Sequence, residues 1–347
     1  MQVFPGSYCE TVIFFTRYCF RKGKIINFGP MVFTELLQPI VILLILMATG
    51  YAVFRLKIIN EGIRDGLARL VMDVTLPLLI LTGIMKLEMS AEILRGSFLM
   101  LVSSYVSLFI LFSAGVGMAR LLHMPGSQAR VHALQTMLGN VVFIGYPLMN
   151  ELFPGGEGLL YASIYHLATN SVLWTFGVWF LSRHSANRLP SRLVRLLNPN
   201  SVALVAGFLL MSLNVPLPSL LDASLGGLGR TTLFLSMIFI GALLASYSRP
   251  RIFSRRSTWL LTVTKMLVIP LILLILFKPF TSGAAPWLDP TALSVLVMQS
   301  AMPCMATFVV VVKRYGADEY LAMDNVMLTT LMSLMILPFL YYLIQLL

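Results

Sequence analysis

Long apolar segments follow one another along almost the whole chain, and short stretches between them hold most of its charges. A helix needs about 20 mainly apolar residues to cross a bilayer. By that measure the pattern predicts ten membrane spans, at roughly 33–54, 66–87, 97–121, 131–152, 159–181, 199–215, 225–247, 257–279, 291–312 and 321–346. The chain is therefore predicted to be an all-α polytopic membrane protein.

Two prolines, Pro147 and Pro303, lie near the middle of the fourth segment of each half of the chain. Proline lacks an N–H and clashes with the preceding turn, so each helix is predicted to open at its proline. Backbone groups exposed at membrane depth must be satisfied by protein or line a wet cavity. Matched interruptions in the two halves indicate the binding site of a transporter.

The composition supports a membrane protein, with 58% hydrophobic and 11% charged residues and a mean hydropathy of +0.87. A soluble chain would carry about 25% charged residues. The net charge of +11 could attract nucleic acid, but the basic residues lie in short loops, and no recognition motif accompanies them. The three cysteines have neither a pairing pattern nor metal-ligand spacing. No metal, cofactor or nucleic-acid partner is predicted.

Basic residues orient the spans, because positively charged loops stay in the cytoplasm. Loops after odd-numbered spans hold Arg55, Lys57, Arg64, Arg69, Arg120, Arg130, Arg183, Arg188, Arg192, Arg195, Arg249, Arg251, Arg255, Arg256, Lys313 and Arg314, whereas loops after even-numbered spans hold only Lys86, Arg95, Arg230 and Lys278. Both termini are therefore predicted to lie outside the cell membrane. The basic tail 1–32 disagrees, either because it holds a re-entrant or interfacial segment or because translation starts at Met31, which we prefer.

A basic linker at 182–198 divides the chain into two repeats, 33–181 and 199–347, with five predicted spans each. An odd number of spans per repeat makes the second repeat enter the membrane from the opposite side. The two repeats are thus predicted to have inverted topology.

Short motifs along the chain from residue 34 onward occur in a distinctive order. They are Pro39, Gly50-Tyr51, Thr75-Leu76-Pro77-Leu78-Leu79, Gly139-Asn140, Gly145-Tyr146-Pro147-Leu148, Leu197-Asn198-Pro199-Asn200, Ile240-Gly241-Ala242-Leu243-Leu244, Ala301-Met302-Pro303 and Leu337-Pro338. On ten predicted spans, this series resembles the auxin efflux carrier family of secondary transporters. The linker is short, so the chain is more similar to compact bacterial carriers of the inner (cytoplasmic) membrane than to plant exporters with a long central loop.

The resemblance implies a fold similar to the bile-acid and sodium/proton antiporter folds, working as an elevator. Spans four and nine would cross at their prolines and bind an anion there. Spans three to five and eight to ten would move against a scaffold of spans one, two, six and seven, through which family members commonly form homodimers.

Asn140 is the leading candidate ligand, because it matches the family position whose side-chain amide reaches a substrate carboxylate. The alternative is a hydrogen bond between helices, which is common for asparagine in membranes. The half-helices would present free N–H donors and partial positive charge, which suit an anion. The other candidate substrate-binding residues are Gly139, Gly145, Pro147, Gln299, Ser300, Pro303, Thr307 and, in span five, Asn170.

Four ionisable residues within or near the spans need separate interpretation. Asp73 is a candidate for proton coupling if desolvated, or it pairs with Arg69 one turn earlier. His166 is a second coupling candidate, or it hydrogen-bonds within a polar stripe. Lys265 is predicted to extend to the cytoplasmic interface rather than to offset an anion. Asp324 is predicted to be a solvated acid near a helix start.

Taken together, these patterns predict a secondary transporter of small organic anions, with H⁺ or Na⁺ as candidate coupling ions. A passive channel or uniporter with the same site is the alternative. An intramembrane enzyme would need convergent catalytic groups that no motif supplies. The chain also lacks a phosphate-binding loop, which argues against an ATP-driven pump.

Overall fold

The computed structural model describes residues 30–88, 90–182, 198–213, 217–246, 254–281 and 288–346, with side chains from residue 41 onward. Nearly all of these residues are helical. The predicted tail 1–32 and the linker 182–198 lie almost wholly outside them. The elements are α2 (Pro30–Arg55), α3 (Glu61–Leu70), η2 (Val71–Thr75), α4 (Leu76–Ile84), α5 (Ala91–Leu121), α6 (Gly126–Met137), η3 (Val141–Gly145), α7 (Tyr146–Leu152), α8 (Glu157–Val172), η4 (Leu173–Gly177), α9 (Val178–Ser182), α10 (Pro199–Ser212), α11 (Ser219–Ala245), α12 (Arg256–Val263), η6 (Thr264–Val268), α13 (Ile269–Phe277), η7 (Lys278–Thr281), α14 (Pro290–Ser300), α15 (Phe308–Arg314) and α16 (Glu319–Leu346).

Three prolines within these helices follow a π-helical turn: Pro77 after η2, Pro147 after η3 and Pro270 after η6. In each case the residue before the proline donates its N–H to a carbonyl five residues back. A π turn widens the helix locally. It thereby makes room for a ring that would clash in a regular α-helix. The chain stays helical through all three prolines.

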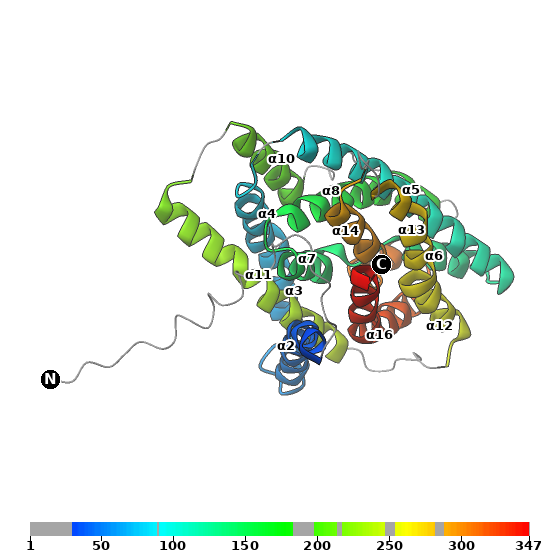
Figure 1. Ribbon diagram of the computed structural model, residues 1–347. Helices are drawn as coiled ribbons and strands as arrows, with labels where there is room; N and C mark the ends of the chain where they lie inside the picture. Colours follow the sequence, from blue (N-terminus) through cyan, green and yellow to red (C-terminus); the bar gives the residue numbers. More distant parts are fainter. Residues whose placement is uncertain are drawn as a thin grey trace.

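The helices pack as two groups, which Figure 1 shows side by side. The first, here called the α11 group, consists of α2, α3, η2, α4, α10 and α11. The second, the α14 group, consists of α5 to α9 and α12 to α16. Among the described residues, the hydrogen bonds and ion pairs between different helices all lie within the α14 group. The two groups meet through apolar side chains and close backbone packing.

Within the α11 group, α2 and α11 approach closely at two glycines. A Cβ on Gly50 would overlap the backbone of Ile238, and one on Gly241 would overlap the carbonyl of Met47. Small residues let membrane helices come this near, since van der Waals packing drives their association. This contact explains why glycine is required in two of the motifs quoted above.

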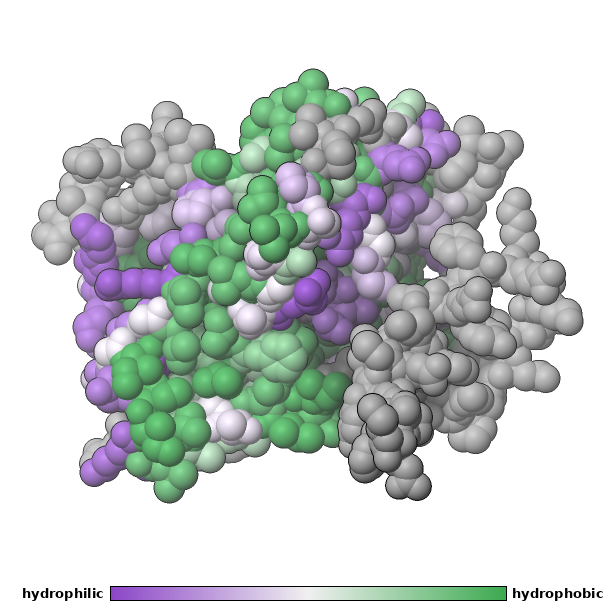
Figure 2. Space-filling model, turned by 90° about the vertical axis from the view of Figure 1, so that its left-hand side faces the viewer, coloured by the Kyte–Doolittle hydropathy of each residue, from purple (hydrophilic) through white to green (hydrophobic). Residues whose placement is uncertain are grey.

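Five continuous helices in the described part are long and apolar enough to cross a membrane: Glu61–Ile84, Ala91–Leu121, Ser219–Ala245, Arg256–Thr281 and Glu319–Leu346. Shorter apolar helices accompany them. Figure 2 shows wide apolar areas on the side of α10 and α11. Exposed apolar residues there include Val205, Leu209, Leu220 and Phe234. The all-helical, polytopic character predicted from the sequence is confirmed.

Candidate functional site

Two helices of the α14 group open near their middles and meet there. The first opening, 138–140, separates α6 from η3, and the second, 301–307, separates α14 from α15. Gly139 and Cys304 form an antiparallel bridge. The Asn140 N–H donates to the carbonyl of Pro303 over 2.7 Å, and the Met305 N–H donates to that of Leu138 over 3.1 Å. We call these two openings the crossing, because each satisfies backbone groups of the other.

The two prolines are not equivalent at the crossing. Pro303 lies inside its opening, as predicted. Pro147 does not open its helix, because it lies in the first turn of α7 behind the π turn η3. That helix opens instead at 138–140, where Leu138 is extended and Asn140 begins the next helical segment. Here Asn140 acts as the cap, with its Oδ1 accepting the Phe143 N–H over 3.3 Å.

Four buried amide side chains have polar atoms without a partner among the described residues, but only Asn140 and Gln299 have an unpartnered amide nitrogen, whereas Asn200 and Asn325 each have an unpartnered Oδ1. Asn140 is 2% exposed, and its Nδ2 is unpaired. Gln299 is fully buried, and both of its side-chain polar atoms are unpaired. The Gln299 amide packs against Gly145, so closely that a Cβ on Gly145 would overlap it. Buried polar groups are normally hydrogen-bonded, so these amides are the strongest candidates for contact with a ligand.

Ser300 and Asn170, two other predicted substrate-binding residues, make side-chain hydrogen bonds within their own helices. Ser300 is buried and donates to the carbonyl of Val297 over 2.7 Å, which satisfies its hydroxyl within its own helix. Thr307 precedes α15 without a side-chain capping bond. Asn170 accepts the Trp174 Nε1–H over 3.0 Å within the helix that begins with α8. No contact with a ligand is needed to account for Ser300.

The carboxyl end of α6 is satisfied by residues from the second half of the chain. Cys304 Sγ donates to the carbonyl of Gln135 over 3.5 Å, and Lys265 Nζ donates to that of Thr136 over 2.8 Å. Lys265 is fully buried. The prediction that it extends to the cytoplasmic interface is therefore wrong, because the free carbonyls of an interrupted helix lie within its reach.

A buried hydrogen-bond network of Gln135, Asn325 and Thr329 lies next to the crossing and was not predicted from the sequence. The Gln135 side chain donates to the carbonyl of Ala322 and accepts from Asn325, each over 2.8 Å. Thr329 Oγ1 accepts the Cys304 N–H over 3.0 Å. Polar residues inside predicted spans were the available signal, but their partners are too distant in sequence to identify.

The two candidates for ion coupling differ in burial. His166 is 6% exposed and its ring lies 5.8 Å from that of Tyr146, so it is close to η3 and α7. Asp73 is exposed on η2, which packs against α11, and it makes no ion pair with Arg69 among the described residues. The burial on which a coupling role depends is thus present at His166 and not at Asp73.

Asp324 is not the solvated acid predicted from its position. Its side chain is 6% exposed and lies 3.3 Å from the guanidinium of Arg255. The helix α16 begins earlier than expected, at Glu319, which places Asp324 in its second turn against α12. The ion pair joins two helices of the α14 group.

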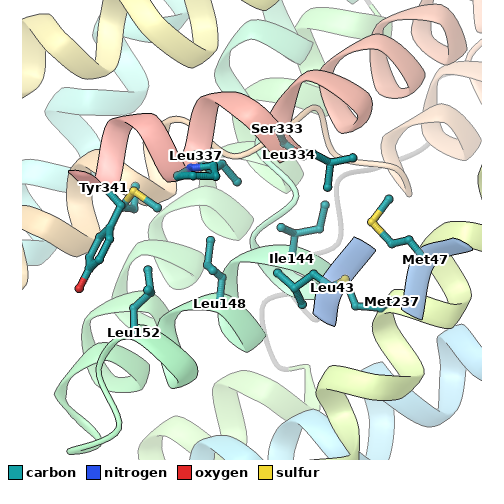
Figure 3. Close-up of a pocket in the computed structure, with 12 residues that line it drawn as sticks. Leu43, Met47, Ile144, Leu148, Leu152, Met237, Ser333, Leu334, Leu337 and Tyr341 are labelled. Atoms are coloured by element: carbon teal, nitrogen blue, oxygen red, sulfur yellow. The ribbon is translucent and has the colours of Figure 1, made fainter. Parts of the chain in front are cut away.

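An apolar cavity lies beside the crossing, where the two helix groups meet (Figure 3). Figure 3 shows Leu43, Met47 and Met237 of the α11 group facing Ile144 and Leu148 of η3 and α7. The remaining lining residues are Leu152, Met298, Ser333, Leu334, Leu337, Pro338 and Tyr341. The cavity is thus almost wholly nonpolar and reaches the helix that Asn140 caps.

Comparison with known protein families gives one match that covers nearly the whole chain. A family model described as "Membrane transport protein" matches residues 35–341. A search of the curated proteins gives no match.

Proposed function

Because the chain belongs to this family of membrane transport proteins, the auxin efflux carrier family, we propose that it is a secondary transporter of small organic anions bearing carboxylates. The observation that carries the proposal is the unpartnered, buried amide nitrogens of Asn140 and Gln299 at the crossing. Amide N–H groups are hydrogen-bond donors, and a carboxylate is an acceptor only.

The electrostatics of the crossing favour an anion. The helix Val141–Leu152 begins at Asn140, with the partial positive charge of a helix N-terminus. Hydrogen bonds to a charged group are stronger than those between neutral groups, and more so away from water. In this proposal Asn140 Nδ2 donates to one carboxylate oxygen and Gln299 Nε2 to the other.

The apolar cavity supports an organic acid rather than an inorganic anion. It adjoins Ile144, four residues along the helix from Asn140. In this proposal the carboxylate binds at the crossing while the hydrocarbon part of the substrate occupies the cavity. Mostly apolar pockets with a few polar groups are typical of small-molecule sites.

Two features support transport by relative movement of the helix groups. The described hydrogen bonds and ion pairs between helices stay within the α14 group, and the cavity lies at the boundary. We propose ten spans in two inverted repeats, with the α14 group moving past the α11 group as an elevator. We further propose termini outside, a homodimer formed through the α11 group, and coupling to H⁺ or Na⁺ with His166 as the better-placed residue.

Reconstitution into proteoliposomes tests this function. Uptake of labelled malonate and indole-3-acetate should be saturable and inhibited by excess unlabelled acid. Accumulation above equilibrium in a pH or sodium gradient indicates secondary transport, whereas uptake that only equilibrates indicates a uniporter. If no carboxylate in a broad panel is taken up by correctly inserted protein, the proposal fails.

A further inference from the structure

Lys265 is a buried cation without an acidic partner in the part of the chain that the structure describes. It lies in η6 and is 0% exposed. Its Nζ makes one hydrogen bond, of 2.8 Å, to the carbonyl of Thr136. The ion pairs among the described residues are Arg64–Asp65, Arg255–Asp324 and Lys313–Glu319, so no described carboxylate lies within 4 Å of Lys265.

One carbonyl is a weak counterpart for a full charge at membrane depth. An ammonium group has three donors, and Thr136 accepts from one of them. The carboxyl end of a helix carries roughly half a negative charge, so α6 balances only part of the ammonium charge. Buried charges are otherwise paired or bind an ion, because their desolvation is costly.

The position of Lys265 connects this uncompensated charge to the crossing. Thr136 lies two residues before the opening 138–140, and the neighbouring carbonyl of Gln135 accepts from Cys304 of the other opening. We propose that Lys265 supplies the positive charge that balances the carboxylate of a substrate bound at the crossing. This inference rests on the proposed function, carboxylate transport, and assigns the preference for anions over neutral ligands to Lys265.

The competing interpretation is that Lys265 only caps α6. A cap stabilises the helix end whether or not a substrate is charged. A charge-balancing residue instead discriminates between an acid and its uncharged analogue. The distinction is therefore one of ligand charge, which can be varied while the shape of the ligand is kept.

The experiment measures binding to the purified full-length protein by calorimetry. The probes are malonate and indole-3-acetate, each compared with its amide, malonamide or indole-3-acetamide. Lys265→Met removes the charge at similar length, and Lys265→Arg keeps it. Lys313→Met serves as the matched control, because Lys313 is 73% exposed and paired with Glu319.

For Lys265→Met we expect acid binding to weaken on the order of tenfold to a hundredfold, the range for one charge interaction in a partly buried site. Amide binding should change less than about threefold, since that ligand carries no charge to balance. Lys265→Arg should retain most of the acid affinity, and Lys313→Met should behave as wild type.

Equal weakening of acid and amide would show a capping role alone and overturn the proposal, as would unchanged acid affinity. If Lys265→Met does not fold, Lys265→Gln provides the test, because its amide can still donate a hydrogen bond. Wild-type protein that binds the acid and its amide equally would also refute the proposal, without any variant. Wild-type protein that neither binds nor transports carboxylates would instead contradict the proposed function itself.

Discussion

The backbone amide of Asn140 donates a 2.7 Å hydrogen bond to the carbonyl of Pro303, in the other half of the chain. The bond holds the main chain of Asn140 independently of its side chain. The Asn140 side-chain amide can therefore be removed while this backbone contact of the crossing is kept, so the role we propose for it in transport can be separated from any role in folding.

Asn140→Ala should reduce transport to near background while the protein stays folded. The variant loses the proposed carboxylate donor and the bond to the Phe143 N–H. Loss of such a helix cap costs about 1 kcal/mol. Proteoliposome uptake and thermal unfolding in detergent measure the two effects. Asn60→Ala is the matched control and should retain transport, because it removes an equivalent N-cap, the bond from the Ile63 N–H, at the start of α3 in the α11 group. Normal uptake by Asn140→Ala would remove Asn140 from the site.

Gly145→Ala should lower transport by displacing Gln299. The added Cβ would overlap the Gln299 amide, which is already fully buried. Overpacking of this kind typically costs about 1–3 kcal/mol. Gly117→Ala in α5 provides the comparison, because a Cβ there meets nothing within 4 Å. Uptake assays on both variants should show a loss only at Gly145, and an equal response from the two would count against a role for Gln299.

Asp324→Asn should destabilise the protein markedly, because it leaves Arg255 without its counter-charge. The Asp324 side chain is 6% exposed and that of Arg255 is 26% exposed, so breaking this partly buried pair should cost between the ~1 kcal/mol of a surface pair and the ~3 kcal/mol of a fully buried one. Glu319→Gln breaks an ion pair whose lysine is 73% exposed, for which less than about 1 kcal/mol is expected. Melting temperatures of the two variants provide the comparison. Similar melting temperatures would mean that the Arg255–Asp324 pair contributes no more than a surface pair.

Glu157, which begins α8 before the predicted span 159–181, should make stability depend on pH. Burial raises the pKa of its carboxyl, and the charge of Asp289 raises it further, against a hydrogen bond from Thr291. A carboxyl with a raised pKa stabilises the fold while protonated and loses that contribution as pH rises through the raised pKa. Between pH 4 and pH 7, wild type should therefore lose more thermal stability than Glu157→Gln. Parallel melting curves across this range would contradict the prediction.

Segment length was enough to predict the helices, because a bilayer constrains apolar helices more tightly than water does. Each predicted span overlaps helical structure. The position of one opening was mispredicted, since a proline rule developed for regular helices takes no account of a π turn such as η3. Pro303, which no π turn precedes, lies where the rule places it.

The polar contacts were harder to predict than the helices. Asn140 was predicted as a ligand because it matches a family motif, and the structure places it within the opening 138–140. The hydrogen-bond partner of Lys265 was missed because Thr136 is 129 residues away in sequence, in a helix of the other half of the chain. A lysine in an apolar segment can reach either an interface or a free carbonyl, and only tertiary packing decides between them.

The contact between α2 and α11 at Gly50 and Gly241 limits where motion can occur. Sliding one helix past the other by a turn, about 5.4 Å, would bring a larger side chain, such as Phe54 in place of Gly50 or Met237 in place of Gly241, against the backbone of the neighbouring helix. Sliding between these two helices, one from each half of the chain, is therefore sterically blocked. If the crossing moves during transport, we expect it to move relative to this helix pair.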